Sequence, residues 1–295
     1  MLFSCASSDK QGNETTSKKY KIVCTTGMLG DAVENLVGSK AEVITLMGSG
    51  VDPHLYKATQ GDLKHLLSAD VIVYNGLHLE GKMGDVFNKM TKRKKMIVAS
   101  NALQESWLIN NTDFQGAQDP HIWFDVSLWI KAIDFIGKEL MAANDTLAPT
   151  IVSNWTNYEQ QLQELDTYVK KEIESIDSAK RVLITAHDAF GYFGRAYHIE
   201  VKGLQGISTV SEYGLKDVSN LVDFISKRGI KAVFVESSVS DRSLKAVIEG
   251  CQSKGHSVEI GGTLFSDAMG AKGTEEGTYV GMVKHNVKTM VNGLN

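Results

Sequence analysis

Short β-branched runs alternate with segments of helical periodicity from Tyr20 onward. The runs expected to form strands are 20–25, 42–47, 71–75, 95–99, 181–185, 231–236 and 257–260. Amphipathic helices are expected at 28–37, 59–69, 189–197, 242–254 and 279–291, and a further helix is expected after its cap Asp125. Such alternation is typical of parallel sheets with crossover helices, so the pattern predicts an α/β fold with mostly parallel sheets.

One helical stripe is much longer than the others. Its apolar positions recur every three or four residues, at Ile151, Trp155, Tyr158, Leu162, Leu165, Val169, Ile173 and Ile176. No glycine interrupts it, and Pro149 lies where a first turn tolerates proline. The stripe predicts one helix of about 28 residues, roughly 40 Å long. Because a crossover helix is shorter, we expect a rigid helix that joins two lobes.

The expected organisation is therefore a signal remnant and tether at 1–19, an N-terminal lobe at 20–147, a linking helix at 148–177 and a C-terminal lobe at 178–295. A chain of 295 residues that is 42% hydrophobic can supply both lobes with cores. Its net charge of −4, without a basic stripe, excludes nucleic acid as an expected partner. No apolar run reaches the ~18 residues of a membrane span.

The three cysteines have two different interpretations. Cys24 and Cys251 lie in apolar segments and are expected to be buried free thiols. Leu2-Phe3-Ser4-Cys5 fits the box at which bacterial lipoproteins are cleaved and lipidated, and residues 6–19 form a polar tether. We expect a lipid anchor at Cys5, although an ordinary ragged N-terminus remains the alternative because no apolar signal region precedes the box.

Two Asp-Pro-His triplets, 52–54 and 119–121, contain two of the three prolines in the chain. Proline fixes its own φ and keeps the preceding residue extended, so each triplet is a stiff corner that presents a histidine. We interpret His54 and His121 as two ligands of one metal ion. Asp52 and Asp119 could orient these imidazoles or simply form the turns.

His187 and Asp267 follow predicted strands of the second lobe. Ligands of parallel sheets gather beyond the carboxyl ends of the strands, so four candidates converge on the cleft between the lobes: His54, His121, His187 and Asp267. Three imidazoles and a carboxylate suit a divalent transition ion. Taken alone, a histidine after a strand is more often a core residue, and an aspartate a turn former. His78 is a candidate for a supporting role, and Trp123 for packing. The other histidines, His65, His198, His256 and His285, are expected at helix surfaces or strand ends.

Two other functions compete with that of a metal receptor. Residues 76–83 approach a phosphate-binding loop, but Met83 replaces the required hydroxyl and Glu80 would repel phosphate. A zinc-dependent hydrolase is the stronger alternative. Catalytic zinc usually keeps three protein ligands and an open position, however, whereas four ligands divided between two lobes indicate a receptor and not an enzyme.

Several motifs resemble the cluster A-I, or TroA-like, receptors of bacterial ABC importers for zinc and manganese. The resemblance runs from Tyr20 to Leu294 and includes 50–56, 75–77, 119–123, 185–190, 264–267 and 277–279. It implies two lobes joined by a rigid helix, with an ion buried between them at His54, His121, His187 and Asp267. It also implies an extracytoplasmic monomer that delivers its cargo to a membrane permease with a separate ATPase subunit.

Two departures bear on the cargo. The zinc-dedicated branch carries a His-rich loop before the second triplet, and residues 104–118 contain no histidine. The manganese-dedicated branch has glutamate where this chain has His187. We therefore expect Zn²⁺ or Mn²⁺ as transported cargo, with three nitrogen ligands favouring zinc in vitro.

Overall fold

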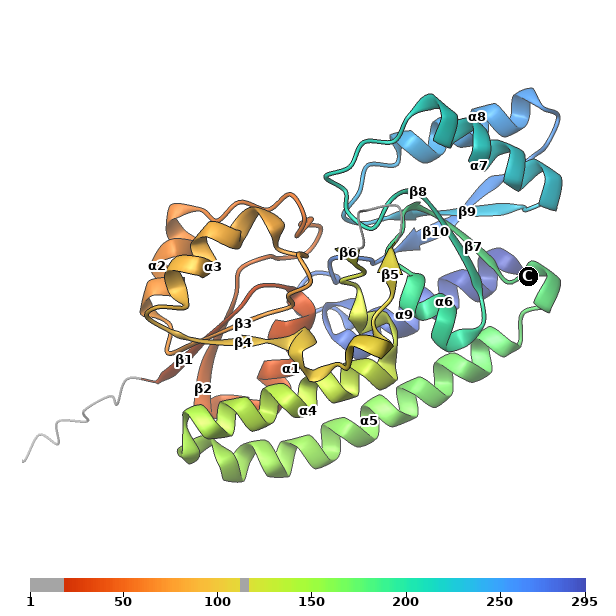
Figure 1. The fold of residues 1–295 in the computed structure, drawn as a ribbon. Coiled ribbons are helices and arrows are strands. Elements are labelled where there is room, and N and C mark those ends of the chain that lie inside the picture. The colour runs from red at the N-terminus through yellow and green to blue at the C-terminus, as the bar shows by residue number, and fades with distance from the viewer. Residues whose placement is uncertain (1–18, 112–116) are drawn as a thin grey trace, which may run out of the picture.

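Two lobes lie side by side over a pair of long helices (Figure 1). The computed structural model describes residues 19–111 and 117–295. Cys5 and most of the expected tether lie outside the described residues, so the lipid-anchor prediction has no structural test. Within the described part of the chain, no helix combines the length and apolar character needed to cross a membrane.

The first lobe contains a parallel four-stranded sheet in the order β2-β1-β3-β4. Its elements are β1 (Tyr20–Cys24), α1 (Gly27–Val37), β2 (Ala41–Thr45), α2 (Gln60–Ser68), β3 (Val71–Tyr74), α3 (Gly84–Met90) and β4 (Lys95–Val98). A short antiparallel hairpin, β5 (Asn110–Asn111) and β6 (Ala117–Gln118), precedes the second triplet, and α4 (Val126–Ala143) follows it.

The second lobe has a parallel four-stranded sheet in the order β10-β9-β7-β8. Its elements are β7 (Val182–His187), α6 (Gly191–Tyr197), β8 (Glu200–Gln205), α7 (Leu215–Arg228), β9 (Ala232–Glu236), α8 (Arg242–Ser253), β10 (Glu259–Leu264) and α9 (Tyr279–Leu294). Read from the opposite edge, the strands take the same order as in the first lobe. Both sheets therefore present the carboxyl ends of their central strands as ligand-binding edges.

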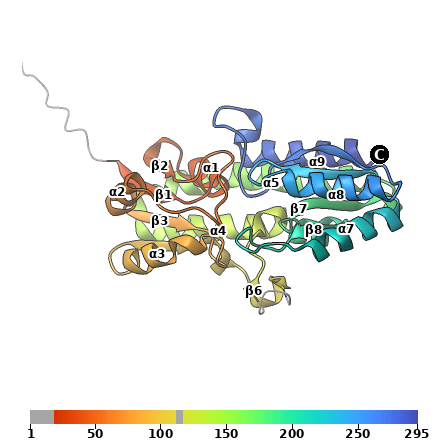
Figure 2. The same cartoon turned by 90° about the horizontal axis from the view of Figure 1, so that it is seen from above.

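The long helix predicted from the apolar stripe is α5 (Ala148–Glu174), with 27 residues. It packs against α1 and α4 on one side of the molecule and against α6 and α9 on the other (Figures 1 and 2). Seven of the eight stripe positions are buried, including Ile176 just beyond the end of the helix, and Trp155 is partly buried. The helix thus contacts elements of both lobes.

The predicted caps form as expected. The Thr59 side chain and Asp62 make a reciprocal capping box at the start of α2. The Asp125 carboxylate accepts hydrogen bonds from two backbone amides in the first turn of α4. Gly38 closes α1 at a φ of 53°, a conformation that a residue with a Cβ rarely adopts.

Besides the short hairpin of β5 and β6, one strand and two α-helices of the described residues were not among the predicted elements: β8, α3 and α7. Strand β8 lies at a sheet edge and alternates partly buried with exposed positions, so it carries little hydrophobic signal. Helix α7 buries only Leu221, Val222 and Ile225, and its first residue, Leu215, is exposed. Its apolar residues nevertheless recur at helical spacing, at Val218, Leu221, Val222 and Ile225, so the sequence pattern could have indicated this helix.

The lobes share one hydrophobic core. Phe124 of the first lobe stacks on Phe190 of the second with ring centroids 4.3 Å apart, and Trp129 lies 5.4 Å from Tyr279. These residues belong to one cluster that continues through α4, α5 and α9. Such a large apolar contact resists wide separation of the lobes. As predicted, Cys24 and Cys251 are buried free thiols.

Candidate metal centre

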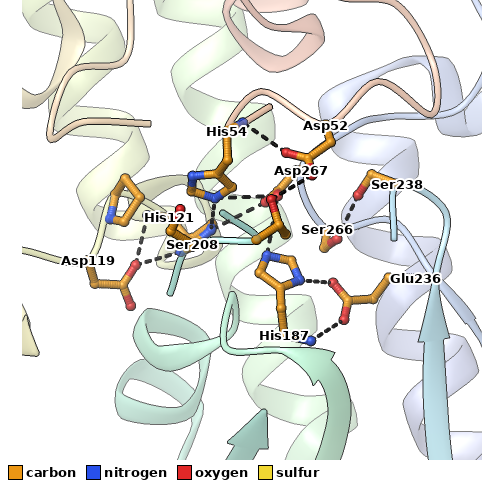
Figure 3. Close-up of polar contacts among 12 residues, drawn as sticks. Asp52, His54, Asp119, His121, His187, Ser208, Glu236, Ser238, Ser266 and Asp267 are labelled. Carbon is orange, nitrogen blue, oxygen red and sulfur yellow. Dashed lines mark hydrogen bonds and ion pairs between the residues drawn. The ribbon is translucent and has the colours of Figure 1, made fainter. Parts of the chain in front are cut away.

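The four candidate ligands meet between the lobes (Figure 3). His54 lies in the loop after β2, and His121 follows β6. His187 is the last residue of β7, and Asp267 follows β10. One ligand atom from each lies within 4.8 Å of the others. The structure thus brings together all four residues that the sequence indicated.

Four distances within this cluster are close to the edges of a tetrahedral metal site. The Nε2 atoms of His54 and His121 are 3.4 Å apart. Oxygens of Asp267 lie 3.6 Å, 3.3 Å and 3.2 Å from Nε2 of His54, His121 and His187, respectively. A tetrahedral site with bonds of about 2.0–2.1 Å has edges of roughly 3.3–3.4 Å. The cluster is therefore close in size to a four-coordinate site for a divalent ion.

The cluster is buried, and its only carboxylate is surrounded by imidazoles. The side chains of His54, His121, His187 and Asp267 are at most 2% exposed. The Asp267 oxygens lie 3.2–3.6 Å from imidazole nitrogens of the same cluster. A buried carboxylate needs a nearby positive charge, which protonated imidazoles or a bound metal ion can supply. Three imidazoles and a carboxylate fit a transition metal ion as cargo.

Burial and neighbouring charges separate the histidine pKa values. Burial dominates at His54 and lowers its pKa to about 3. Burial also opposes protonation of His121, but Asp119 and Asp267 outweigh it and raise its pKa to about 9. At His187, Glu236 and Asp267 likewise outweigh burial and hold the pKa well above its usual value. An incoming metal ion must therefore displace protons from His121 and His187.

Carboxylates orient two of the three imidazoles. Asp119 Oδ1 lies 2.7 Å from His121 Nδ1 and also accepts a 2.9 Å hydrogen bond from His121 N. Glu236 Oε2 lies 2.5 Å from His187 Nδ1, while Oε1 accepts from His187 N at 2.9 Å. With Nδ1 engaged, Nε2 of each ring faces the cluster, the arrangement typical of metal-bound histidine. Sequence reasoning missed Glu236, for which a lone acid ending the apolar strand β9 was the available signal.

Asp52 behaves differently from Asp119. Its Oδ1 accepts a hydrogen bond from His54 N at 2.8 Å, so it forms the turn. Its Oδ2 accepts a 2.6 Å hydrogen bond from the hydroxyl of Thr209, which belongs to the second lobe. Of the two roles left open for Asp52, the structure shows the turn-forming one.

The second triplet is held by the opposite lobe at several points. The indole N–H of Trp123 donates to the carbonyl of Ser266, beside Asp267, at 3.1 Å. The Tyr279 hydroxyl donates to the carbonyl of Trp123 at 2.7 Å, and the Tyr192 hydroxyl donates to that of Asp119 at 3.0 Å. Trp123 is buried as expected, but its role exceeds packing because it joins the two halves of the site.

The segment 76–83, which approaches a phosphate-binding loop in sequence, binds one of its own carboxylates in the structure. The Glu80 carboxylate is buried and accepts hydrogen bonds from Asn75 N, Gly76 N and the Thr25 hydroxyl. The amides that a phosphate would need thus serve an internal carboxylate. His78 is exposed and lines a separate cavity of about 680 Å³, so it does not support the cluster. The remaining histidines also lie outside the cluster: His65 on α2, His198 after α6, His256 after α8 and His285 on α9.

Two lobes that enclose a buried cluster of ligands define the solute-binding class of receptor. The family described as "Zinc-uptake complex component A periplasmic" (ZnuA) matches residues 22–293. The chain belongs to this family, and the resemblance to TroA-like receptors is confirmed.

Individual relatives agree over almost the whole chain. The manganese-binding lipoprotein MntA of Bacillus subtilis is 50% identical over 281 residues, which cover 95% of this chain and 92% of the relative. The zinc-binding protein TroA of Treponema pallidum is 46% identical over 276 residues, or 94% and 89% of the two chains. The solved TroA structure superposes with a TM-score of 0.91, covering 94% of this chain and 99% of the other. The predicted two-lobed α/β fold is thereby confirmed.

Proposed function

We propose that this protein is an extracytoplasmic solute-binding protein that captures a divalent transition metal ion between its lobes and delivers it to an ABC permease. His54, His121, His187 and Asp267 are the proposed ligands, with Zn²⁺ or Mn²⁺ as cargo. The observation that carries the proposal is the convergence of four buried ligand atoms, three imidazole nitrogens and one carboxylate oxygen, within 4.8 Å of one another.

The relatives support this cargo class without choosing within it. One is named a manganese-binding lipoprotein and another a zinc-binding protein. Three nitrogen donors favour zinc over manganese in vitro by ligand preference and the Irving–Williams order. The protein is proposed not to be an enzyme, because four protein ligands fill a tetrahedral zinc shell and leave no position for an activated water. The hydrolase alternative has no support among the relatives.

The proposed partners follow from the same class. A membrane permease with a separate ATPase subunit would receive the ion from a monomeric receptor made of an N-terminal lobe, a linking helix and a C-terminal lobe. A lipid at Cys5 would hold the receptor at the membrane surface, in line with relatives that are named lipoproteins. Detergent partitioning of the protein expressed with a complete signal tests this, since Cys5→Ser should move it to the aqueous phase.

His187 provides the sharpest test of the metal site. His187→Glu replaces a nitrogen donor by oxygens, which manganese prefers, so the zinc-over-manganese affinity ratio should fall by at least about tenfold, or ~1.4 kcal/mol. His187→Ala should weaken both ions, and His65→Ala, on the exposed side of α2, should change neither. Competition titration against a chromophoric chelator measures all four proteins. A wild type that binds neither ion would refute the proposed function.

A further inference from the structure

An ion bound among the four ligands has no open route to solvent. Each ligand side chain is at most 2% exposed, so release requires part of the structure to move. The shared core and the long helix α5 oppose a wide separation of the lobes. The moving part is therefore expected to be smaller than a lobe, and the contacts around each ligand indicate which part it is.

Three of the ligands are built into well-packed segments. His121 precedes buried Trp123 and Phe124, which contact the second lobe. His187 ends a fully buried strand, and Asp267 follows the carbonyl of Ser266 that accepts from Trp123. None of these three can leave without breaking the core contacts between the lobes.

His54 lies in the loop 46–59 between β2 and α2, which packs on the core of its own lobe through Met47 and Val51 but has few contacts with the second lobe. Its neighbour Leu55 is 50% exposed. Outside the four-ligand cluster, the bond from Thr209 to Asp52 is the one hydrogen bond between this loop and the second lobe among residues 19–111 and 117–295. The loop thus depends on a single polar contact across the cleft.

Thr209 is itself held in place. It lies in the loop that follows β8, and its carbonyl accepts a 3.0 Å hydrogen bond from Gln205 Nε2. The same amide also donates to the carbonyl of Ser211. The Thr209 hydroxyl is therefore presented from a braced loop. Asp52 Oδ2 accepts the hydrogen bond from the Thr209 hydroxyl, and its Oδ1 accepts one from His54 N. One carboxylate thus connects the loop after β8 to the turn that carries His54.

We infer that the Asp52–Thr209 hydrogen bond is a latch that holds the His54 loop closed and sets the rate of ion release. The inference rests on the proposed function, because it concerns how the same site retains its cargo. A hydroxyl that donates to a carboxylate at 2.6 Å makes a strong, charge-assisted bond. Thr209 is a positioning residue in this scheme: it touches no ion, and acts through Asp52 on His54.

Zinc release from the loaded protein tests the latch. Thr209→Val keeps the shape of the side chain and removes the hydroxyl, and should accelerate release into excess chelator by about tenfold in stopped-flow measurements. The association rate should change much less, since differences within one site fall mainly on dissociation. Thr209→Ser keeps the hydroxyl and should release zinc near the wild-type rate. Thr167→Val, an exposed site on α5, is the matched control and should leave release unchanged.

A double-mutant cycle separates the latch from a general effect of the loop. In an Asp52→Ala background, Thr209→Val should add almost nothing, because the bond is already lost. Unchanged release in Thr209→Val, equal release in the Val and Ser variants, or additive effects in the cycle would each overturn the latch while leaving the proposed function intact. A wild type without zinc binding would instead overturn the proposed function.

Discussion

The two Asp-Pro-His triplets share their sequence and their turn, yet they occupy different mechanical positions. In both, the aspartate Oδ1 accepts a hydrogen bond from the histidine amide, at 2.8 Å in the first and 2.9 Å in the second. Beyond that bond they diverge. Asp119 is 1% exposed and contacts the ring of its own histidine, whereas the partly buried Asp52 reaches Thr209 in the opposite lobe.

The difference shows that the triplet sequence determines the turn, whereas the neighbouring elements determine which group the aspartate contacts. Proline and the aspartate amide bond fix where each histidine starts. The neighbouring elements determine the other contacts of each aspartate. The second triplet is enclosed by the core, while the first lies on a loop with an exposed side. Both triplets therefore contact the opposite lobe, but the Asp119 carboxylate orients the ring of its own histidine, whereas the Asp52 carboxylate contacts Thr209.

The two triplets should differ most clearly in the effect of replacing their aspartates by asparagine. Asp119→Asn removes the charge beside His121 Nδ1 and should lower the zinc affinity by about 10- to 100-fold. Asp52→Asn retains an acceptor for His54 N and touches no ring, so its affinity loss should be about fivefold or less. Equilibrium competition with a chelator measures both. Equal losses in the two variants would show that the triplets are equivalent after all.

Glu236 allows the ring contact to be examined without a triplet. Glu236→Gln should weaken zinc binding by about tenfold, because His187 loses the carboxylate that fixes its Nδ1. The matched control is Glu249→Gln on the exposed side of α8, which should bind zinc like the wild type. If Glu236→Gln also left the affinity unchanged, a carboxylate at Nδ1 would not matter for zinc binding. The Asp119–His121 contact would then not explain any difference between the triplets.

The segments behind the triplets should also differ in stability. Trp123→Phe leaves the buried carbonyl of Ser266 without its donor and should lower the free energy of unfolding of the metal-free protein by about 1–3 kcal/mol. Leu55→Ala, beside His54 on the exposed loop, should change it by about 0.5 kcal/mol or less. Urea titration followed by circular dichroism provides both values. A larger loss for Leu55→Ala would contradict the assignment of the first triplet to the looser segment.

The smallest expected effect concerns overall shape. If only the first triplet and its loop move, adding zinc should leave the radius of gyration almost unchanged, because α5 has no proline or glycine in its interior at which to kink. Small-angle X-ray scattering with and without zinc measures this. A contraction of several ångströms on binding would mean that the second triplet moves as well.

Much of this fold could be predicted from local sequence patterns. The periodic stripe predicted α5, and the caps Thr59 and Asp125 predicted where α2 and α4 begin. The four proposed ligands could be selected because triplets and strand ends are local features that parallel topology brings together.

The partners of those ligands were not predictable in the same way. Glu236 is 49 positions from His187, and Thr209 is 157 positions from Asp52. The acid at the end of β9 marks Glu236 as a candidate, but no local pattern pairs it with His187 or Thr209 with Asp52, because each contact exists only once separate strands and loops have been assembled. Orientation and latching are therefore properties of the fold, while the identity of the ligands is largely a property of the sequence.

The long helix α5 has a consequence for affinity as well as for shape. Each lobe supplies only two of the four proposed ligands, so either lobe alone would be a weak bidentate chelator. By packing against both lobes, α5 keeps the second pair of donors at a high effective concentration for an ion already held by the first. The helix α5 thus contributes to the metal affinity by holding the two lobes together, although it contributes no ligand.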